Sequence, residues 1–422
     1  MGSDLDLVGD REPLRNWAGN HRYRAARVVT PSSVEELREI VTTADRVRAL
    51  GSRHSFNRIC DTSGVLIDTR ALVTGPILDE ERGSMTVSPG VTFGAVAQAL
   101  DGTRWALPNL GSLPHISVIG AVSTGTHGSG TGNQVLAASV TRMRLMLADG
   151  FTVDVRRGDD TFEGCVVSVG ALGVVLEVDL QLVPTFDVVQ TLDDAGAWEH
   201  AYLAVPEVLS SAYSVSVFTR WGRGATEILA KHRVESAADH VSPSTKETSM
   251  LLVDGPNLTA RDARVSWSAG LPHFRMEFEP SFGEEIQSEF FVSSGDTVEA
   301  LAAVTALADV LDPHLIVSEI RAIASDSLWL SPAYGRDSTS LHFTWKLEPE
   351  PVERVNALVA EALAPLAARP HWGKRFPGGT ALRDSYPRAA SFLSLAQDLD
   401  PTRKFTNDFI DETLGSAPAT DG

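Results

Sequence analysis

The chain is poor in cysteine and, compared with its acidic residues, in basic ones. It has 2 cysteines among 422 residues, Cys60 and Cys165, and no Cys-x-x-Cys pair. Two isolated cysteines exclude a disulfide framework and favour buried free thiols in a reducing compartment. The 36 Lys and Arg residues are outnumbered by 55 Asp and Glu residues, which gives a net charge of -19. That charge repels nucleic acids and anionic lipid surfaces, so we expect neither as a partner.

Long apolar runs and a leader segment are missing as well. No apolar run approaches the ~20 residues that a membrane-spanning helix needs. The sequence starts Met-Gly-Ser-Asp-Leu-Asp-Leu and lacks the basic and apolar stretches of a secretory signal peptide. We therefore expect a cytoplasmic protein without a membrane partner.

Several common site motifs are also missing. The sequence contains no HExxH metal motif, no GxSxG nucleophile motif and no GxGxxG dinucleotide motif, and its histidines are scattered, so no metal site is predicted. What is present is a composition of 43% hydrophobic and 22% charged residues, as in a soluble globular protein. At ~150 residues per domain, this length predicts two or three domains.

Local patterns predict both helices and strands. Ser33 and Glu36 can form a capping box before a helix from Val34 to Ala44. Alternating residues on both sides of Asp149-Gly150 predict a hairpin. The same reasoning predicts a strand over 46–50 and a strand-like region over 166–183. It also predicts three further helices, over 93–100, 298–311 and 352–366, of which the helix over 298–311 can be capped by Asp296. Strands and helices come in blocks and do not alternate regularly, so the predicted fold class is α+β.

The most informative segment runs from Leu107 to Asn133. Its many glycines expose backbone N–H groups, and its interleaved Ser and Thr hydroxyls add further donors for phosphate oxygens. A second Gly/Ser turn lies upstream, directly after a predicted strand, with His54 at its tip. Two such turns, each with a histidine, favour a dinucleotide cofactor over an ordinary pair of surface loops.

These motifs resemble those of a known family. The segments Gly51-Ser-Arg-His-Ser-Phe-Asn57, Leu107-Pro-Asn-Leu-Gly-Ser-Leu-Pro-His115 and Gly120-x-x-x-Thr-Gly-Thr-His-Gly-Ser-Gly130 look like the FAD-binding motifs of the vanillyl-alcohol oxidase family. Within that family the chain most resembles the alditol oxidases. The implied fold has two domains, with an FAD-binding domain over 1–185 and an antiparallel-sheet substrate domain, or cap, over 186–380. Residues 381–422 would return to the FAD domain.

The resemblance also implies how FAD is held. In this family a histidine of the first motif is often joined covalently to the 8α-methyl carbon of the flavin, and His54 matches that position. The cation of Arg53, where many members have Gly, favours the neutral imidazole that such a bond needs. The implied flavin contacts are Gly51, Ser52, Arg53, His54, Ser55, Ser112, Ser117, Gly120, Thr124, Gly125, Thr126, His127 and Val174.

Two later segments carry polar residues at every second position. Glu319 and Arg321 share one face of a predicted strand over 316–323. In the second segment the residues on one face are Ser340, His342, Thr344 and Lys346. From periodicity alone, an antiparallel sheet with one solvated face is the simpler interpretation. If the strands lie side by side, these groups could instead bind a substrate with many hydroxyls, because each hydroxyl both donates and accepts hydrogen bonds.

The resemblance favours the second interpretation. Alditol oxidases bind substrate with Glu, Arg, His and Thr on matching strands and with a lysine in a motif similar to His371-Trp-Gly-Lys374. The implied substrate contacts are Ser112, Glu319, Arg321, Thr344 and Lys374. The implied catalytic residues are His342 as the base, and Arg321 and Lys374 as cations that stabilise the developing alkoxide.

The implied activity is oxidation of the terminal primary alcohol of a polyol such as xylitol or sorbitol. Hydride passes to FAD, and O2 is reduced to H2O2. Gly111, which has no side chain next to the flavin, would leave room for O2. Two alternatives stay open: an oxidase or dehydrogenase acting on sugar 1,4-lactones, and a non-catalytic flavin- or sugar-binding protein. The expected partners are a polyol and O2, and we expect a monomer.

Overall fold

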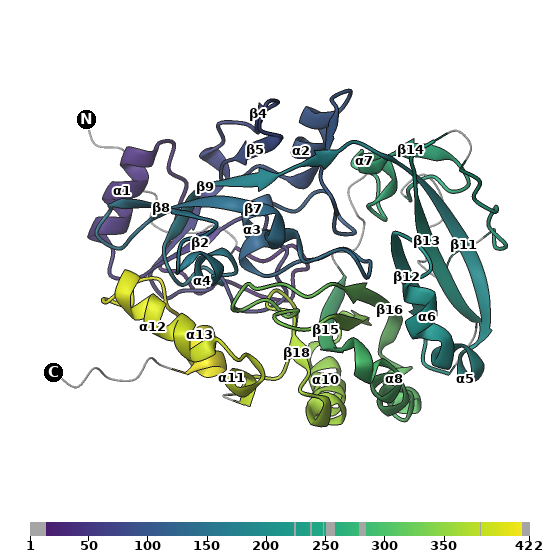
Figure 1. Cartoon of the computed structure of the whole chain (residues 1–422). Coiled ribbons are helices and arrows are strands. Elements are labelled where there is room, and N and C mark those ends of the chain that lie inside the picture. Colours follow the sequence, from purple (N-terminus) through teal and green to yellow (C-terminus); the bar gives the residue numbers. More distant parts are fainter. Residues whose placement is uncertain are drawn as a thin grey trace.

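The computed structural model describes residues 14–222, 225–236, 239–247, 249, 258–277, 284–379 and 381–415. The first residues, considered above for a leader, lie outside this set. The described strands form a small parallel sheet, a five-stranded sheet, a two-stranded pair and an eight-stranded sheet (Figure 1). Sheets and helices come in blocks, so the predicted α+β class is confirmed. None of the helices in the described ranges has the length and apolar character needed to cross a membrane.

The strands before residue 185 form the smaller sheets. The parallel sheet has the order β1-β3-β2, which are Arg27–Val29, Val65–Asp68 and Val47–Leu50. The five-stranded sheet has the order β4-β5-β9-β7-β8, which are Ile77–Asp79, Ser84–Val87, Val174–Gln181, Val140–Met146 and Thr152–Arg156. The pair joins β6 (Trp105–Ala106) to β10 (Val183–Pro184). The helices of this part are α1 (Val34–Thr43), α2 (Phe93–Leu100), α3 (Val118–Ser123) and α4 (Phe162–Val166).

The eight-stranded sheet takes all its strands from later in the chain. Its order is β14-β11-β13-β12-β16-β17-β15-β18, which are Arg264–Ser266, Asp187–Ala197, Ala225–Val234, Ser214–Thr219, Leu315–Ile323, Ser338–Lys346, Glu285–Ser293 and Arg369–Pro370. Its helices are α5 (Trp198–Ala201), α6 (Val205–Leu209), α7 (Trp267–Gly270), α8 (Thr297–Thr305), α9 (Ala308–Leu311) and α10 (Pro349–Leu363). The change of sheet coincides with the predicted boundary near residue 185.

One face of this sheet is apolar and lies against α6, α8 and α10 (Figure 1). Leu341, Phe343 and Trp345 of β17 alternate along the strand and are fully buried. The rings of Phe343 and Trp345 stack with their centroids 5.1 Å apart. Because neighbouring residues of a strand point to opposite faces, this packing turns the intervening residues of β17 away from the helices.

The C-terminal segment lies against the N-terminal sheets. It contains α11 (Ala381–Ser385), α12 (Ala389–Leu399) and α13 (Asp408–Leu414). The side chain of Asn407 donates to the carbonyls of Arg58, Ile59 and Asp61 at 3.2, 3.1 and 2.8 Å. Phe405 is buried among apolar residues of α1, β2 and β3. These contacts hold the end of the chain to the part that carries the glycine-rich segment.

Several predicted elements are confirmed, and others differ. The predicted strand at 46–50 is β2, and the predicted hairpin is formed by β7 and β8. The predicted helices at 34–44 and 93–100 are α1 and α2. The helix predicted over 298–311 is broken into α8 and α9, and its N-cap Asp296 makes no side-chain cap bond. The region predicted as strand-like over 166–183 begins at the end of α4, and its strand β9 starts only at Val174. The helix predicted over 352–366 begins three residues earlier, because prolines fit the first turn of α10.

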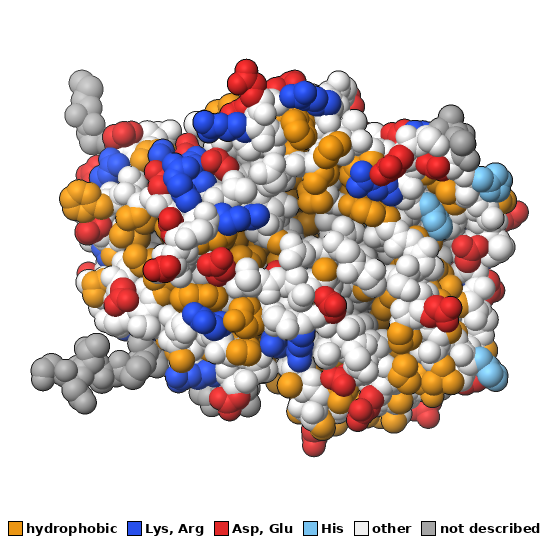
Figure 2. Space-filling view, in the orientation of Figure 1, with side chains coloured by type: hydrophobic (Ala, Val, Ile, Leu, Met, Phe, Trp, Pro, Cys, Tyr) orange, Lys and Arg blue, Asp and Glu red, His pale blue; other side chains and the backbone are white. Residues whose placement is uncertain are grey.

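The surface gives no sign of a basic patch on the side in view. In Figure 2, Lys and Arg side chains are interspersed with Asp and Glu side chains. Part of this mixing comes from ion pairs on the five-stranded sheet, where Arg142 contacts Asp154, Glu177 and Asp179. The face in view therefore lacks the concentrated positive charge that a polyanion would need.

Candidate active site

A cavity lies where the glycine-rich segment meets the polar face of the eight-stranded sheet. The predicted flavin contacts that line it are Gly51, Ser52, Arg53, His54, Ser55, Ser112, Ser117, Gly120, Thr124, Thr126 and His127. The predicted substrate and catalytic residues that line it are Ser112, Glu319, Arg321, His342, Thr344 and Lys374. Segments more than 200 residues apart in the sequence therefore share one cavity.

Two predicted flavin contacts lie elsewhere. The Val174 side chain is fully buried among apolar residues of α1 and the small parallel sheet, whereas its neighbour Val175 lines the cavity. Adjacent residues of β9 point to opposite faces, so the Val174 side chain points away from the cavity and its predicted flavin contact stays a prediction. Gly125 does not line the cavity either. Its φ of +65° turns the chain there, and a Cβ would lie 2.9 Å from Pro332.

Close backbone approach explains why glycine is needed on the flavin side. A Cβ added to Gly51 or to Gly120 would in each case lie 2.6 Å from Oγ of Ser117. The Ser117 side chain forms no helix-capping hydrogen bond, and its backbone N–H donates to Oγ of Ser52 at 3.0 Å. The two glycine-containing turns are thus held directly against each other. This gives the cavity a wall of backbone and hydroxyl groups, of the kind that suits a diphosphate.

His54 is a buried, neutral imidazole at this wall. Burial, and then the nearby charge of Lys374, lower the pKa of His54 to about 4. The ring stacks on Trp17 with centroids 5.2 Å apart. Nδ1 is buried, and no described residue forms a hydrogen bond with it. A buried polar atom without a partner in a ligand-sized cavity is the arrangement expected of an attachment or contact point for a bound group.

The next residue has an unusual backbone. Arg53 has a φ of +63°, in the left-handed region that glycine adopts freely and arginine rarely does. Glycine would adopt this backbone conformation without the steric cost that a Cβ brings. The strained residue turns the chain so that its neighbours His54 and Ser52 both line the cavity.

On the opposite side, three strands place an imidazole between two carboxylates. His342 of β17 is the direct register partner of Glu319 on β16 and of Glu289 on β15. Nδ1 of His342 lies 3.3 Å from Oε2 of Glu289, and Nε2 lies 3.4 Å from Oγ1 of Thr344. Burial lowers the pKa of His342, while Glu289 opposes that shift. The polar faces predicted for the two strands therefore lie side by side over the cavity.

Arg321 joins the two carboxylates. Its Nη2 donates to Oε1 of Glu289 at 2.9 Å, and its Nε lies 3.6 Å from Oε1 of Glu319. Burial alone would raise the pKa of both carboxyl groups, but nearby cations outweigh it and hold both pKa values below their usual range. For Glu289 the largest of these effects comes from His127, and for Glu319 from Arg321. Both carboxyl groups are therefore ionised.

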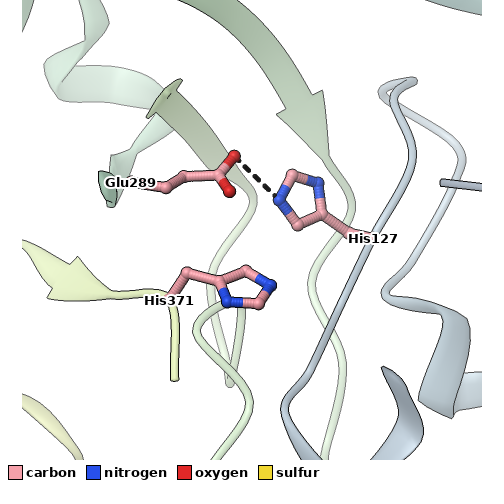
Figure 3. A group of neighbouring side chains, drawn as sticks. All are labelled: His127, Glu289 and His371. Atoms are coloured by element: carbon pink, nitrogen blue, oxygen red, sulfur yellow. Dashed lines mark hydrogen bonds and ion pairs between the residues drawn. The ribbon is translucent and has the colours of Figure 1, made fainter. Parts of the chain in front are cut away.

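Glu289 also contacts His127, which the sequence analysis assigned to flavin binding (Figure 3). Nδ1 of His127 lies 2.8 Å from the Gly128 carbonyl oxygen, and Nε2 lies 3.0 Å from Oε1 of Glu289. The Gly128 carbonyl and the Glu289 carboxylate thus occupy both ring nitrogens. His127 lines the cavity, but neither of its nitrogens is free for a flavin hydrogen bond.

His371 completes the group in Figure 3. The ligand atoms of His127, Glu289 and His371 lie within 4.8 Å of one another, a spacing that could hold a metal ion. Nδ1 of His371 accepts from the Gly373 N–H at 3.0 Å, which leaves the proton of the neutral ring on Nε2. Because Arg321 and His127 already neutralise Glu289, we interpret the group as an electrostatic cluster and not as a metal centre.

Lys374 lies at the other end of the same face. Burial lowers the pKa of Lys374 to about 8, so the ammonium form still predominates at neutral pH. Its Nζ donates to Oε1 of Gln287, and the amide group of Gln287 donates to Glu285. Burial raises the pKa of Glu285 to about 7. Lys374 also lies 4.9 Å from the centroid of the Phe56 ring, which belongs to the flavin-side turn.

A loop after α7 closes the cavity beside Glu319. Nε2 of His273 lies 2.8 Å from Oε1 of Glu319, and its Nδ1 is buried without a partner among the described residues. The loop is held by Lys231, whose Nζ donates to three successive carbonyls, of Gly270, Leu271 and Pro272, at 2.9, 2.6 and 2.9 Å. It also contacts the flavin side, since the N–H groups of residues 273 and 274 donate to the Ser112 carbonyl at 3.1 and 3.2 Å.

Comparison with known proteins identifies the family. Residues 25–156 match an FAD binding domain, and residues 236–413 match D-arabinono-1,4-lactone oxidase. The chain is 39% identical to an alditol oxidase from a Streptomyces species, over 95% of this chain and 99% of that protein. The chain belongs to the vanillyl-alcohol oxidase family of FAD flavoproteins. Another relative of this flavoprotein is an L-gulono-1,4-lactone dehydrogenase from Mycobacterium tuberculosis, 30% identical over 95% of this chain and 98% of the relative.

Solved structures agree on the fold of this flavoprotein. A cholesterol oxidase from B. sterolicum has a TM-score of 0.77 at 12% identity, covering 98% of this chain and 100% of that chain. A xylooligosaccharide oxidase from Myceliophthora thermophila has a TM-score of 0.70 at 15% identity, covering 96% of this chain and 94% of that chain. The two-domain FAD-binding fold predicted from the sequence is thereby confirmed.

Sequence reasoning missed three groups of cavity residues. Glu285, Gln287 and Glu289 alternate along β15 in the same way as the polar residues of β16 and β17. That alternation was available in the sequence and could have revealed the third strand. His273 and His371 lie in irregular segments, where no periodic pattern marks them.

Proposed function

We propose that this flavoprotein oxidises the terminal primary alcohol of an alditol such as xylitol or sorbitol to the aldose, with O2 reduced to H2O2. The observation that carries the proposal is a row of buried polar side chains in the cavity. The row consists of Glu289, His342 and Glu319 on adjacent strands, and Arg321 contacts both carboxylates. An alditol has a hydroxyl on every carbon, and each hydroxyl can pair with a member of this row. The 39% identity to an alditol oxidase supports the same substrate class.

His342 is the proposed base. As a neutral imidazole, it would accept the proton of the reacting hydroxyl while the hydride leaves the same carbon, which turns the alcohol into a carbonyl. FAD, when bound, accepts that hydride. Arg321 and Lys374 would stabilise the negative charge that develops on the oxygen as its proton leaves. Ser112, Glu319 and Thr344 would hydrogen-bond the remaining hydroxyls and orient the chain.

His54 is the proposed site of covalent attachment. Its Nδ1 is unpartnered, and the low pKa of His54 keeps the ring in the nucleophilic neutral form. The rest of the flavin side fits a diphosphate and ring system, because Gly51 and Gly120 leave backbone exposed where side chains would collide with Ser117. The fit is independent of whether the bond forms.

A second candidate is the oxidation of a sugar 1,4-lactone. The match to D-arabinono-1,4-lactone oxidase and the 30% identity to a lactone dehydrogenase favour it. A cyclic lactone has fewer hydroxyls than the open-chain alditol of the same length, so it would form fewer hydrogen bonds with these polar side chains. This difference favours the alditol. Since the relatives in both groups are enzymes, a non-catalytic binding protein is the least supported alternative.

The first experiment is an anaerobic visible spectrum of the purified holoprotein. We expect xylitol or sorbitol to bleach the flavin absorbance, and O2 to restore it with release of H2O2. Bleaching by L-gulono-1,4-lactone, with no response to either alditol, would assign the second candidate. Yellow colour that stays in an acid-precipitated pellet supports the covalent bond, and His54→Ala should release it to the supernatant.

A further inference from the structure

We infer that Glu289 is a positioning residue, which holds His342 in the one tautomer that can accept a proton from substrate at Nε2. The inference rests on the proposed function, because it assigns a supporting role behind the proposed base. Nothing in the sequence motifs of the family pointed to this residue; it emerges from the contacts of β15.

Glu289 is itself rigidly held. Its side chain is only 1% exposed, and its strand β15 lies between β17 and the edge strand β18. Oε1 accepts a hydrogen bond from Nη2 of Arg321 at 2.9 Å and also contacts Nε2 of His127 at 3.0 Å. These two contacts occupy Oε1 and direct the remaining oxygen, Oε2, to Nδ1 of His342 at 3.3 Å. The carboxylate therefore cannot move away from the imidazole without breaking two buried ion pairs.

That oxygen fixes the position of the proton on His342. Nδ1 forms no hydrogen bond among the described residues, so its 3.3 Å contact with Oε2 is electrostatic. The charge of an ionised carboxylate repels a ring lone pair, so it favours the tautomer that carries the proton on Nδ1. In a neutral imidazole the other nitrogen, Nε2, then has the lone pair that a base needs. Nε2 lies 3.4 Å from the Thr344 hydroxyl, and both side chains line the cavity. In this arrangement Nε2 of His342 is the base, and the negative charge of Glu289 lies on the opposite side of the ring.

The charge of Glu289 also acts on the protonated ring. The charged or titratable groups around His342 are Glu289 on β15, Glu319 and Arg321 on β16, Lys374 after β18, and His127 in the glycine-rich segment. Glu289 favours the imidazolium that forms when the proton is taken up, whereas Lys374 and Arg321 oppose it. Removing the charge of Glu289 should therefore lower the pKa of His342 and weaken it as a base.

The test is anaerobic stopped-flow reduction of holoprotein flavin by xylitol, from pH 5 to 9, in wild type and Glu289→Gln. We expect the limiting rate of the variant to fall by about 10- to 100-fold. We also expect the acidic limb of its pH profile to move down by about one unit or more, because a base of lower pKa stays neutral to lower pH. Glu348→Gln is the matched control. Glu348 contacts a histidine, His314, at 2.6 Å outside the cavity, and neither rate nor profile should change.

A second measurement avoids any dependence on turnover or on the stability of the variant. Nitrogen-15 NMR of histidine-labelled wild type, with His342→Gln for assignment, reports which ring nitrogen carries the proton. A proton on Nδ1 supports the inference, and a proton on Nε2 overturns it. In the kinetic test, a slower Glu289→Gln with an unmoved pH profile would also overturn it, since that is the signature of a purely structural role. If wild-type flavin is not reduced by any alditol, the proposed function fails, while the NMR result still decides the role of Glu289.

Discussion

A substitution at Gly111 can distinguish the access of O2 to the flavin from the oxidation of the alcohol. Gly111 lines the cavity beside Ser112, and a Cβ there would come no closer than 3.6 Å to its neighbours. A small side chain is therefore compatible with the fold. We expect Gly111→Val to slow flavin reoxidation by O2 by about tenfold, or ~1.4 kcal/mol of activation free energy, with a smaller effect on reduction by xylitol. Stopped-flow measurement of both half-reactions checks this.

The matched control is Gly132→Val, in the same glycine-rich segment. Gly132 has no atom within 4 Å of an added Cβ and does not line the cavity, so both half-reactions should stay as in wild type. Equal slowing of reduction and reoxidation in Gly111→Val would instead mean that the side chain disturbs the flavin or the substrate and does not control O2.

At the same scale, sequence reasoning was most successful where chemistry and periodicity coincided. Glu319, Arg321 and His342 alternate with apolar residues and also match substrate residues implied by the family resemblance, and all three line the cavity. Glu289 follows the same rule on β15 but carries no motif of its own. Val174 is implied by the resemblance alone, and no periodic pattern in the sequence shows that the side chain of Val175, and not that of Val174, lines the cavity.

At the scale of elements, the loop that follows α7 is the clearest link between the two sides of the cavity. Lys231 of β13 holds it through three backbone carbonyls, an arrangement that needs all three protons of the ammonium group. We expect Lys231→Met to leave these buried carbonyls without their donor and to destabilise the fold by about 3 kcal/mol. The loop should also loosen around His273 and raise the KM for xylitol.

Thermal unfolding and steady-state kinetics of the same preparation test this. Lys246→Met is a useful comparison, because Lys246 pairs with Glu227 near the edge of the sheet and donates to no carbonyl of the loop. It should leave the KM unchanged whatever its effect on stability. A stable Lys231→Met with wild-type KM would show that the loop is held by its other contacts alone.

Prediction of elements failed where a helix or strand depended on distant parts of the chain. The apolar spacing over 298–311 suits one helix, but the helix is interrupted between α8 and α9. Leu311 is buried as part of the separate helix α9. The irregular part before residue 280 contains the loop with His273, whose position is set by Lys231 and Ser112 and not by local propensity. Local sequence carries information on hairpins and amphipathic helices, but not on contacts made across 40 or more residues.

At the scale of the whole molecule, the two predicted domains share one apolar core. A continuous cluster of buried side chains runs from Ile59 and Met85 in the N-terminal part to Phe343 and Trp345 under the eight-stranded sheet, and on to Leu414. Residue 185 therefore separates the strands of the smaller sheets from those of the eight-stranded sheet, but the apolar core is shared by the two predicted domains. Domains that share a core lose much of their stability when separated, which favours joint unfolding.

We accordingly expect one cooperative unfolding transition in the holoprotein. Six of the eight tryptophans lie within residues 186–380, and Trp198, Trp221 and Trp345 are fully buried under the eight-stranded sheet, so most of the tryptophan fluorescence comes from the cap. Flavin fluorescence reports on the glycine-rich side, because it rises when the ring is exposed to water. The two signals should change at the same urea concentration, since bound FAD contacts both sides of the cavity and stabilises them together. Two separated transitions would mean that the cap unfolds independently and that the shared core contributes little to cooperativity.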